Sequence, residues 1–148
     1  SPEDSPVRLF DAMGLHRTIV EVSRQLFSDR HYSQAIFEAF KAVNNCVKHR
    51  TGSDLDGERL MATVFDENKP LLLINEGGSK SDSDERRGFK FLYMGAWTGI
   101  RNPKAHDEVP QEDPLRTLKY LALASLLVEV AERARLSSGL SALGEKAA

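Results

Sequence analysis

The stretch "YSQAIFEAFKAVNNCVKHRTG", residues 32–52, constrains the fold most, because its apolar residues recur at the period of an α-helix. The apolar stripe consists of Ile36, Ala39, Phe40, Val43 and Val47. A polar stripe runs at the same period and consists of Gln34, Glu38, Lys41, Asn45 and Lys48. Gly52 then supplies a helix C-cap. The pattern predicts a long helix with one buried face.

Similar spacing indicates helices over residues 16–27, 54–65 and about 85–100. The third has an inward stripe of Phe89, Leu92, Tyr93, Ala96 and Ile100. Asp113 as N-cap and Pro114 as first helical residue predict a last helix ending near Arg135. This last helix is apolar nearly all round, which indicates a central helix or a second face buried in a partner. We therefore expect an all-α, compact bundle of about five helices.

The remaining segments are less regular. Residues 1–14 contain Pro and Gly and predict a flexible lead-in, and residues 137–148 predict a frayed C-terminal tail. A single helical domain is expected between them, over residues 15–136. "LLLIN", residues 71–75, is a short strand or a tucked-in loop, since no partner strand with matching alternation is visible. We expect a short irregular or β-like insertion near residues 70–82.

Composition limits the function classes. The 148 residues suit one soluble domain, and the net charge of −2 excludes a global basic field, so nucleic-acid binding would need a local patch. Cys46 is the single cysteine, which excludes a disulfide within the chain and favours a reducing compartment, hence a cytoplasmic protein. No membrane span or signal peptide is visible. Because the chain starts Ser-Pro-Glu-Asp, we expect a trimmed piece of a longer protein.

The segment "GIRNPKAH" places an arginine and a histidine five positions apart. In one continuous helix, Arg101 and His106 would face about 140° apart around the axis. Pro103 disfavours a helical conformation at Asn102, so the preceding helix should stop there, with Asn102 as the N-cap of a new turn. Arg101 and His106 then occupy the two positions that pack together in a hydrophobic staple. The spacing predicts a helix–break–helix junction.

The residue types at this junction suit phosphate chemistry. Arg101 offers a planar, permanently charged fork for phosphate oxygens, and a neutral His106 could act as general base. Asn102 could cap the turn or orient a phosphate. The alternative is structural: a capped turn with a solvated Arg101 and a packed His106. No metal-ligand set is apparent, so we expect neither metal nor cofactor.

Other residues could join such a site. Glu38 and Lys41 share a helix face that could line a cleft beside Arg101, or could simply be solvated. Arg87 belongs to a small basic cluster that could touch RNA phosphates, although such clusters are usually only exposed. Trp97 lies one turn before Arg101 and could stack on a base, but packing is the more common role of tryptophan.

"RNPKAH" matches the R-N-x-x-x-H form of the motif that marks the HEPN superfamily, the higher-eukaryote and prokaryote nucleotide-binding domains. The blocks "AIFEAFKAVNNCVKHRTG", "DGERLMATVF", "GFKFLYMGAWTGIRNPKAH" and "LALASLLVEVAERA", in that order, resemble the uncharacterised bacterial Ymh-like family, which is similar to HEPN domains. The resemblance covers roughly residues 16–135 and is carried by the order of the blocks more than by the short motif.

The resemblance implies a helical bundle that forms a homodimer and cleaves RNA without a metal, in a toxin–antitoxin or phage-defence setting. RNA would be the substrate, and an antitoxin or regulatory protein a possible partner. Arg101 would stabilise the phosphate charge, His106 would move protons, and Asn102 would support the turn. Lys104, Lys41, Glu38, Arg87 and Trp97 would then be the candidate substrate contacts.

Some HEPN domains have lost catalysis, so a second reading stays open. The chain would then be a non-catalytic HEPN-like binding module for a protein or nucleotide, forming the C-terminal part of a larger protein. The two readings differ at the motif: a nuclease should bring two motifs together in a positive cleft, whereas a binding module need not. A metal-dependent hydrolase is poorly supported, because the histidines are scattered.

Overall fold

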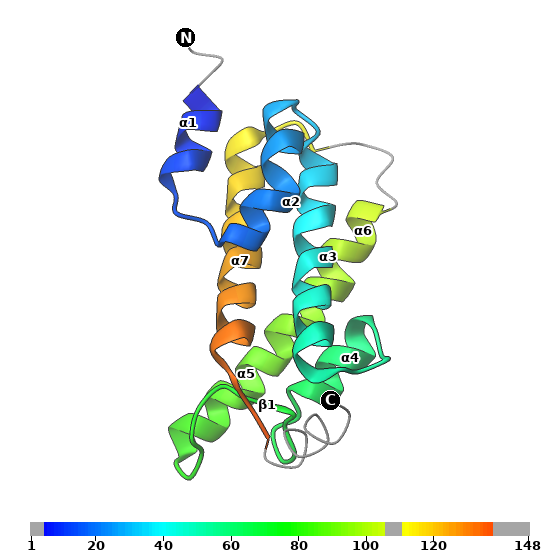
Figure 1. The fold of residues 1–148 in the computed structure, drawn as a ribbon, viewed down its shortest axis with the longest axis vertical. Coiled ribbons are helices and arrows are strands. Elements are labelled where there is room, and N and C mark those ends of the chain that lie inside the picture. The colour runs from blue at the N-terminus through cyan, green and yellow to red at the C-terminus, as the bar shows by residue number, and fades with distance from the viewer. Residues whose placement is uncertain (1–4, 106–110, 138–148) are drawn as a thin grey trace.

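The computed structural model describes residues 5–105 and 111–137, and within them the all-α prediction is confirmed (Figure 1). The elements in chain order are α1 (Ser5–Ala12), α2 (Arg17–Ser28), α3 (Tyr32–Thr51), α4 (Gly57–Val64), β1 (Leu72–Leu73), α5 (Lys80–Ala96), the π-helical turn η1 (Trp97–Arg101), α6 (Asn102–Ala105), α7 (Pro114–Arg133) and β2 (Arg135–Leu136). The bundle therefore contains the predicted helices and adds two short ones, α1 and α6.

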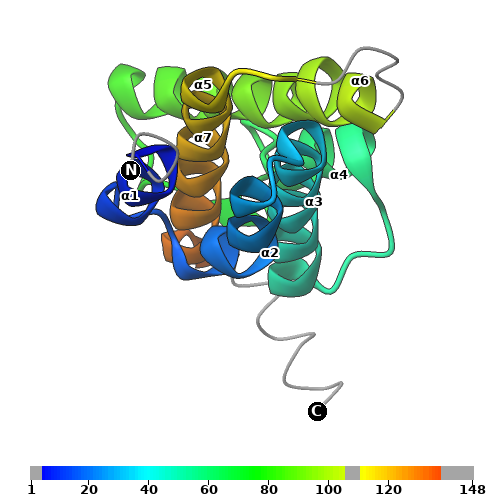
Figure 2. The ribbon, with the colours of Figure 1, turned by 90° about the horizontal axis from the view of Figure 1, so that it is seen from above.

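The helices form three layers. Seen from above, α5, η1 and α6 run in one row along one side, α3 and α7 form the middle, and α1 and α2 cover the other side (Figure 2). The middle helices are the two longest, at 20 residues each, and α3 packs against both α2 and α7. The predicted central position of α7 follows from this arrangement, because its buried side chains face more than one neighbour.

The Gly52 C-cap of α3 and the Asp113 N-cap of α7 are the capping residues that the sequence predicts. Every member of the apolar stripe on α3 is buried, and Gly52 closes the helix in the left-handed conformation, with a φ of 67°. At the start of α7, the Asp113 carboxylate accepts hydrogen bonds from the backbone N–H groups of Leu115 and Arg116, at 2.9 and 3.2 Å. The capping signals in these two segments are therefore confirmed.

Three predictions near the outer helices are wrong. Residues 5–12 of the predicted lead-in form α1, because Phe10 is buried against Phe27, with ring centroids 5.2 Å apart. α5 begins at Lys80 rather than about residue 85, because Ser79 caps it by accepting from the N–H of Asp82 at 3.0 Å. Leu92, expected to face inward, is 47% exposed. Residues 138–148 of the predicted tail lie outside the described residues.

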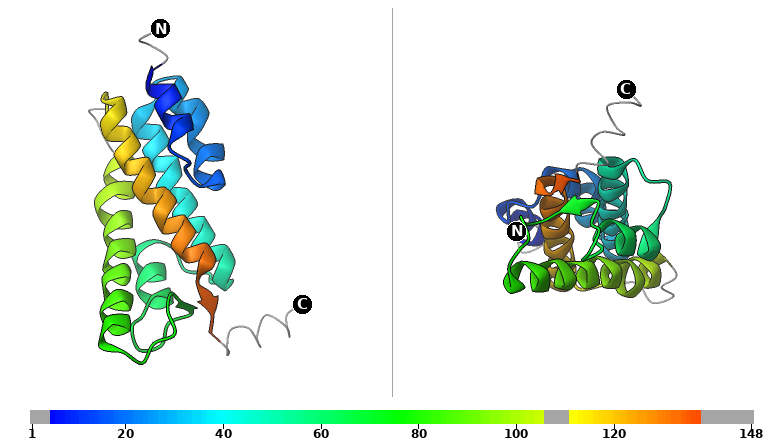
Figure 3. Two further views of the ribbon diagram at one scale, coloured as in Figure 1. Left: turned by 90° about the vertical axis from the view of Figure 1, so that its left-hand side faces the viewer. Right: turned by 90° about the horizontal axis from the view of Figure 1, so that it is seen from below.

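The β-like insertion near residue 72 is confirmed and has a partner. β1 pairs antiparallel with β2, with Leu72 opposite Leu136, so the segment that continues from the end of α7 lies beside the segment that follows α4 (Figure 3). Arg50 fixes this end, since its Nη1 donates to the carbonyl oxygens of Ala131, Glu132 and Ala134, at 2.8, 2.7 and 2.8 Å. No helix among the described residues is long and apolar enough to cross a membrane.

Candidate functional site

The helix that carries the arginine motif does not break at Pro103. Asn102 has helical dihedral angles of −65° and −49°, and its N–H donates to the carbonyl oxygen of Trp97, five residues back. Its predicted role as an N-cap is therefore wrong. Pro103 has no N–H and its ring would crowd the carbonyl group of Gly99, and the wide π turn accommodates both effects without ending the helix.

The π turn places Arg101 between two aromatic rings. Its Cζ lies 4.7 Å from the ring centroid of Phe37 on α3 and 4.3 Å from that of Trp97. Nη1 donates to Oδ1 of Asn102 at 3.3 Å, and Nε is buried without a hydrogen-bond partner in the described chain. No carboxylate among the described residues forms an ion pair with Arg101. Its orientation comes from cation–π stacking and one amide.

Trp97 is held in turn by the start of α4. Gly57 has a φ of +66°, and a Cβ built on it would lie 2.6 Å from Nε1 of Trp97, closer than real Cβ contacts allow. Thr98 adds a second link, since its hydroxyl donates to a carboxylate oxygen of Glu58 at 3.1 Å. The close approach of the α4 backbone to the indole therefore requires glycine at position 57.

A buried amide fixes the segment that contains Gly57. Asn44 of α3 is 3% exposed; its Oδ1 accepts from the Gly57 N–H at 2.8 Å and its Nδ2 donates to Asp56 at 3.0 Å. Lys48 binds the other Asp56 oxygen at 2.9 Å. The Asn44 hydrogen bond, followed by Lys48, lowers the pKa of Asp56 below its usual value, and the more distant charge of Arg101 acts in the same direction. Contacts thus run unbroken from α3 to the guanidinium.

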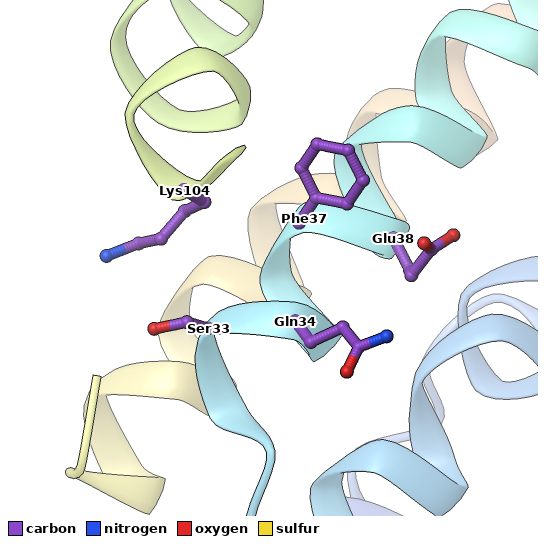
Figure 4. A pocket seen from close by; sticks show the side chains of 5 residues that line it. All are labelled: Ser33, Gln34, Phe37, Glu38 and Lys104. Carbon is purple, nitrogen blue, oxygen red and sulfur yellow. The ribbon is translucent and has the colours of Figure 1, made fainter. Parts of the chain in front are cut away.

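An open surface pocket of about 370 Å³, called the Arg101 pocket below, lies beside Phe37, one of the two rings that contact Arg101. Its lining residues come from α3 and α6 and are Ser33, Gln34, Phe37, Glu38 and Lys104. Figure 4 shows the ring of Phe37 projecting between Glu38 and Lys104, with the ammonium of Lys104 pointing away from the Glu38 carboxylate. Because Phe37 also contacts Arg101, the pocket and the arginine share one wall.

The predicted site residues within the described chain fall into two groups. Arg101, Asn102, Trp97, Lys104 and Glu38 lie at the π turn or line the pocket. Two others do not join them. Lys41 is exposed and does not line this pocket. Arg87 lies over Phe91 at 5.6 Å and precedes Arg101 by fourteen residues, about 20 Å along a helix.

The predicted partner of Arg101, His106, lies outside the described residues. Arg101 itself lies inside the helical row, not before an N-cap, so the staple argument for bringing the two side chains together no longer holds. Within the described chain, no three His, Cys, Asp or Glu side chains gather as a metal ion would require. The geometry of the described part is that of a fixed cation beside an open pocket.

Phe37, Asn44, Asp56 and Gly57 belong to the site but were not predicted. Only Asn44 had a readable signal, since it lies on the same helical stripe as Phe40 and Val47 and is thus a polar residue at a core position. Phe37 looks like any apolar residue of α3. In the sequence Gly57 is an ordinary glycine at the start of a helix, and only the structure shows the indole of Trp97 against it.

A family model described as a protein of unknown function, Hypoth_ymh, matches residues 13–130. The chain belongs to the Hypoth_ymh family. The matched segment runs from just before α2 into α7, so Arg101 and the two rings that contact it lie within the part of the chain that matches the family. The earlier resemblance to a Ymh-like family is thereby confirmed. No curated protein and no solved structure matches the chain.

Proposed function

We propose that this Hypoth_ymh protein is a HEPN-like, metal-independent endoribonuclease that cleaves RNA at the Arg101 site. The supporting observation is the guanidinium of Arg101, held between Phe37 and Trp97 without an ion pair in the described chain, beside an open pocket that Lys104 also lines. A cation fixed before the substrate arrives stabilises transition-state charge without reorganising. The R-N-x-x-x-H resemblance supplies the reaction class.

In the proposed reaction the RNA 2′-oxygen attacks the adjacent phosphorus. The bond from the 2′-oxygen to phosphorus forms and the bond from phosphorus to the 5′-oxygen breaks, which leaves a 2′,3′-cyclic phosphate and a 5′-hydroxyl. His106 takes the 2′-hydroxyl proton, and a proton is returned to the leaving 5′-oxygen. Arg101 stabilises the charge on the non-bridging oxygens, and Asn102 holds Nη1 of Arg101.

The proposal extends to the oligomer and the setting. Two copies would bring two Arg101 sites into one cleft, as the HEPN resemblance implies, and the activity would serve bacterial defence or a toxin–antitoxin pair. Sedimentation of the purified protein tests the dimer separately from the chemistry. A strictly monomeric protein that still cleaves RNA would contradict the composite site and leave the cleavage proposal standing.

The deciding experiment is cleavage of a labelled structured RNA in EDTA by the parent protein, Arg101→Ala, Arg101→Lys and His106→Ala. We expect the parent to leave cyclic phosphate ends, and both alanine variants to lose about a hundredfold or more in rate. Arg101→Lys should lose nearly as much, because lysine keeps the charge but not the planar fork. RNA that is 2′-O-methylated throughout should stay intact.

Arg133→Ala is the matched control, since it removes an exposed arginine whose ion pair is with Glu129 on the same helix. It should cleave at the parent rate. Thermal denaturation of each variant separates loss of chemistry from loss of fold. An inert parent, or alanine variants that cleave as fast as the parent, would overturn the nuclease proposal.

A non-catalytic binding module is the second candidate, and one observation favours it. Phe91 and Leu92 on α5 are 52% and 47% exposed, and large exposed apolar side chains are a feature of interaction surfaces. In that case Phe91→Asp would abolish binding of the partner protein, while Arg101→Ala would leave it unchanged. If Phe91→Asp binds the partner as the parent does, the module reading loses its support.

A further inference from the structure

Two cations from different helices converge on the ring of Tyr120. Nζ of Lys104 on α6 lies 5.6 Å from the ring centroid, and Cζ of Arg116 on α7 lies 5.7 Å from it. Arg116 also donates to the Tyr120 hydroxyl at 3.4 Å. The ring is half-buried, so part of its surface remains open to solvent. An aromatic ring flanked by cations can accept both the flat face and the charge of a nucleotide.

The same tyrosine lines a second open pocket, of about 290 Å³, together with Arg116, Lys119 and Leu123. Arg116 and Lys119 are exposed, and neither forms an ion pair within the described part of the chain. No carboxylate among the described residues therefore forms an ion pair with either charge. This surface, the Tyr120 patch, consists of Arg116, Lys119, Tyr120 and Leu123.

The position of Arg116 on α7 is unfavourable for the helix dipole. Arg116 lies in the first turn, where the dipole favours negative charge, and the acidic group at this helix end is the Asp113 carboxylate at the N-cap. The folded protein gains no capping or ion-pair energy from the two cations in exchange. An external anion is the kind of ligand that would balance them.

The Tyr120 patch adjoins the Arg101 pocket through Lys104. This side chain lines the Arg101 pocket, and its Nζ lies 5.6 Å from the ring centroid of Tyr120, which lines the second pocket. A ligand with a single phosphate would fill only one of them. A polymer with regularly spaced phosphates could occupy both, with a base beside Tyr120.

We propose that the Tyr120 patch binds single-stranded RNA on its way to or from the Arg101 pocket. Arg116 and Lys119 bind backbone phosphates, and Tyr120 stacks on an unpaired base. The inference rests on the proposed function in taking RNA as the ligand of the Arg101 site. A single strand is required because a base inside a duplex is already stacked and cannot lie on the ring.

Binding is measured by fluorescence anisotropy with a labelled single-stranded RNA of about twelve nucleotides, 2′-O-methylated throughout so that it cannot be cut. We expect Arg116→Glu and Lys119→Glu each to weaken binding by about tenfold at low salt. Lys119→Ala should lower the slope of log affinity against log salt by about one phosphate contact. Arg133→Glu is the matched control, with the same charge change on an exposed arginine of α7, and should bind as the parent does.

Stacking is tested at the ring. Tyr120→Ala should weaken binding by about tenfold with little change in salt dependence, whereas Tyr120→Phe should bind as the parent does. Because Tyr120 is half-buried, thermal denaturation checks the alanine variant. The glutamate variants do not depend on this check, since both positions are exposed.

The outcomes separate this inference from the nuclease proposal. If the parent binds the methylated strand through Lys119 and Tyr120 but leaves unmodified RNA uncut, the nuclease proposal fails and the Tyr120 patch stands. If the parent cleaves RNA, and Arg116→Glu and Lys119→Glu bind and cleave equally well, the patch fails and the nuclease stands. Absence of any binding by the parent also overturns the patch.

Discussion

The guanidinium of Arg101 is oriented by two aromatic rings instead of by a carboxylate. The rings of Phe37 and Trp97 cover the guanidinium, and its only side-chain hydrogen bond in the described chain goes to Asn102. A carboxylate partner would neutralise the arginine and compete with any phosphate. Stacking fixes the plane of the fork while keeping the charge, which is the combination that a phosphate-binding arginine needs.

Gly57→Ala tests how tightly this stack is held. The new methyl group would meet the indole at 2.6 Å, and the φ of +66° is strained for alanine, so we expect a loss of about 2–4 kcal/mol in the free energy of unfolding. Gly52→Ala is the control, with a similar φ of +67° and nothing within 4 Å, and should lose only about 1–2 kcal/mol.

Both variants are measured by urea denaturation and tryptophan emission. Trp97 is the single tryptophan of the chain, so a change in emission reports on the Arg101 stack directly. The Gly57 variant should shift the emission of the folded protein and the Gly52 variant should not. Equal losses of stability with unchanged emission in both would contradict the proposed contact.

Arg30→Gly should make the protein more stable. Arg30 follows α2 with a φ of 63° and is the one non-glycine residue with positive φ in the described chain. Its N–H and that of His31 donate to the carbonyl oxygens of Phe27 and Leu26, a helix end where glycine is usual. We expect a gain of about 1 kcal/mol in urea denaturation. A loss of stability would show that the Arg30 side chain makes a compensating contact.

At the scale of elements, the row formed by α5, η1 and α6 differs most from the sequence prediction. The expected break at Pro103 is absent because a π turn can absorb a proline that a regular α-helix cannot. Local rules for Asn-Pro weigh a cap against a regular helix and do not include this third outcome. The start of α5 was misplaced because Ser79, Ser83 and Asp84 are all acceptable caps, and only tertiary packing selects Ser79.

Tyr93 joins α5 to α7 and gives the pair a pH dependence. Its hydroxyl donates to the carbonyl oxygen of Leu127 at 2.6 Å, and burial raises the pKa of Tyr93 well above its ordinary value. The folded state therefore holds this proton more tightly than the unfolded state. The stability that results is complete below pH 10, roughly the unfolded pKa, and is lost as pH rises further.

Tyr93→Phe should cost about 1 kcal/mol at neutral pH, from the lost hydrogen bond. It should also lose less stability than the parent between about pH 9 and pH 11, because its unfolded state has no phenol at position 93 to ionise. Urea denaturation at several pH values measures both effects. Tyr120→Phe is the control and should retain the steep alkaline loss. A parent and a Tyr93 variant with parallel pH profiles would contradict the buried-phenol account.

At the scale of the whole molecule, periodicity was sufficient where a helix is long and one-sided. α3 and α7 followed from their apolar stripes and caps, and the all-α class followed from them. The β1–β2 pair was missed because its strands have two residues each and lie more than sixty residues apart, too short for a visible alternation. Residue type indicated Arg101 and Lys104 as candidates, whereas Phe37 contacts Arg101 only because of the packing of α3.

A substitution of Arg50 tests whether a change at one end of the bundle alters the surroundings of Trp97 near the other. It binds three carbonyl groups at the end of α7, about thirteen residues along α3 from Phe37. Arg50→Ala should cost about 2–3 kcal/mol in urea denaturation, because a charged donor to three carbonyl groups is lost. Arg133→Ala, which loses only an exposed ion pair, should cost less than about 0.5 kcal/mol. The emission of Trp97 should stay constant in both, and a shift in either would show coupling.

The π turn also sets the angular phase of everything that follows it. Such a turn contains one residue more than a regular helical turn, so α6 is rotated by about 100° from where an uninterrupted helix would place it. This rotation lets Lys104 serve the Arg101 pocket and the ring of Tyr120 together. Removing one residue, such as the exposed Gly99, would remove the wide turn and leave Pro103 in a regular helix, which does not accommodate its ring. Lys104 would then point in another direction, so the length of the η1 segment matters to the two pockets as well as the residues in it.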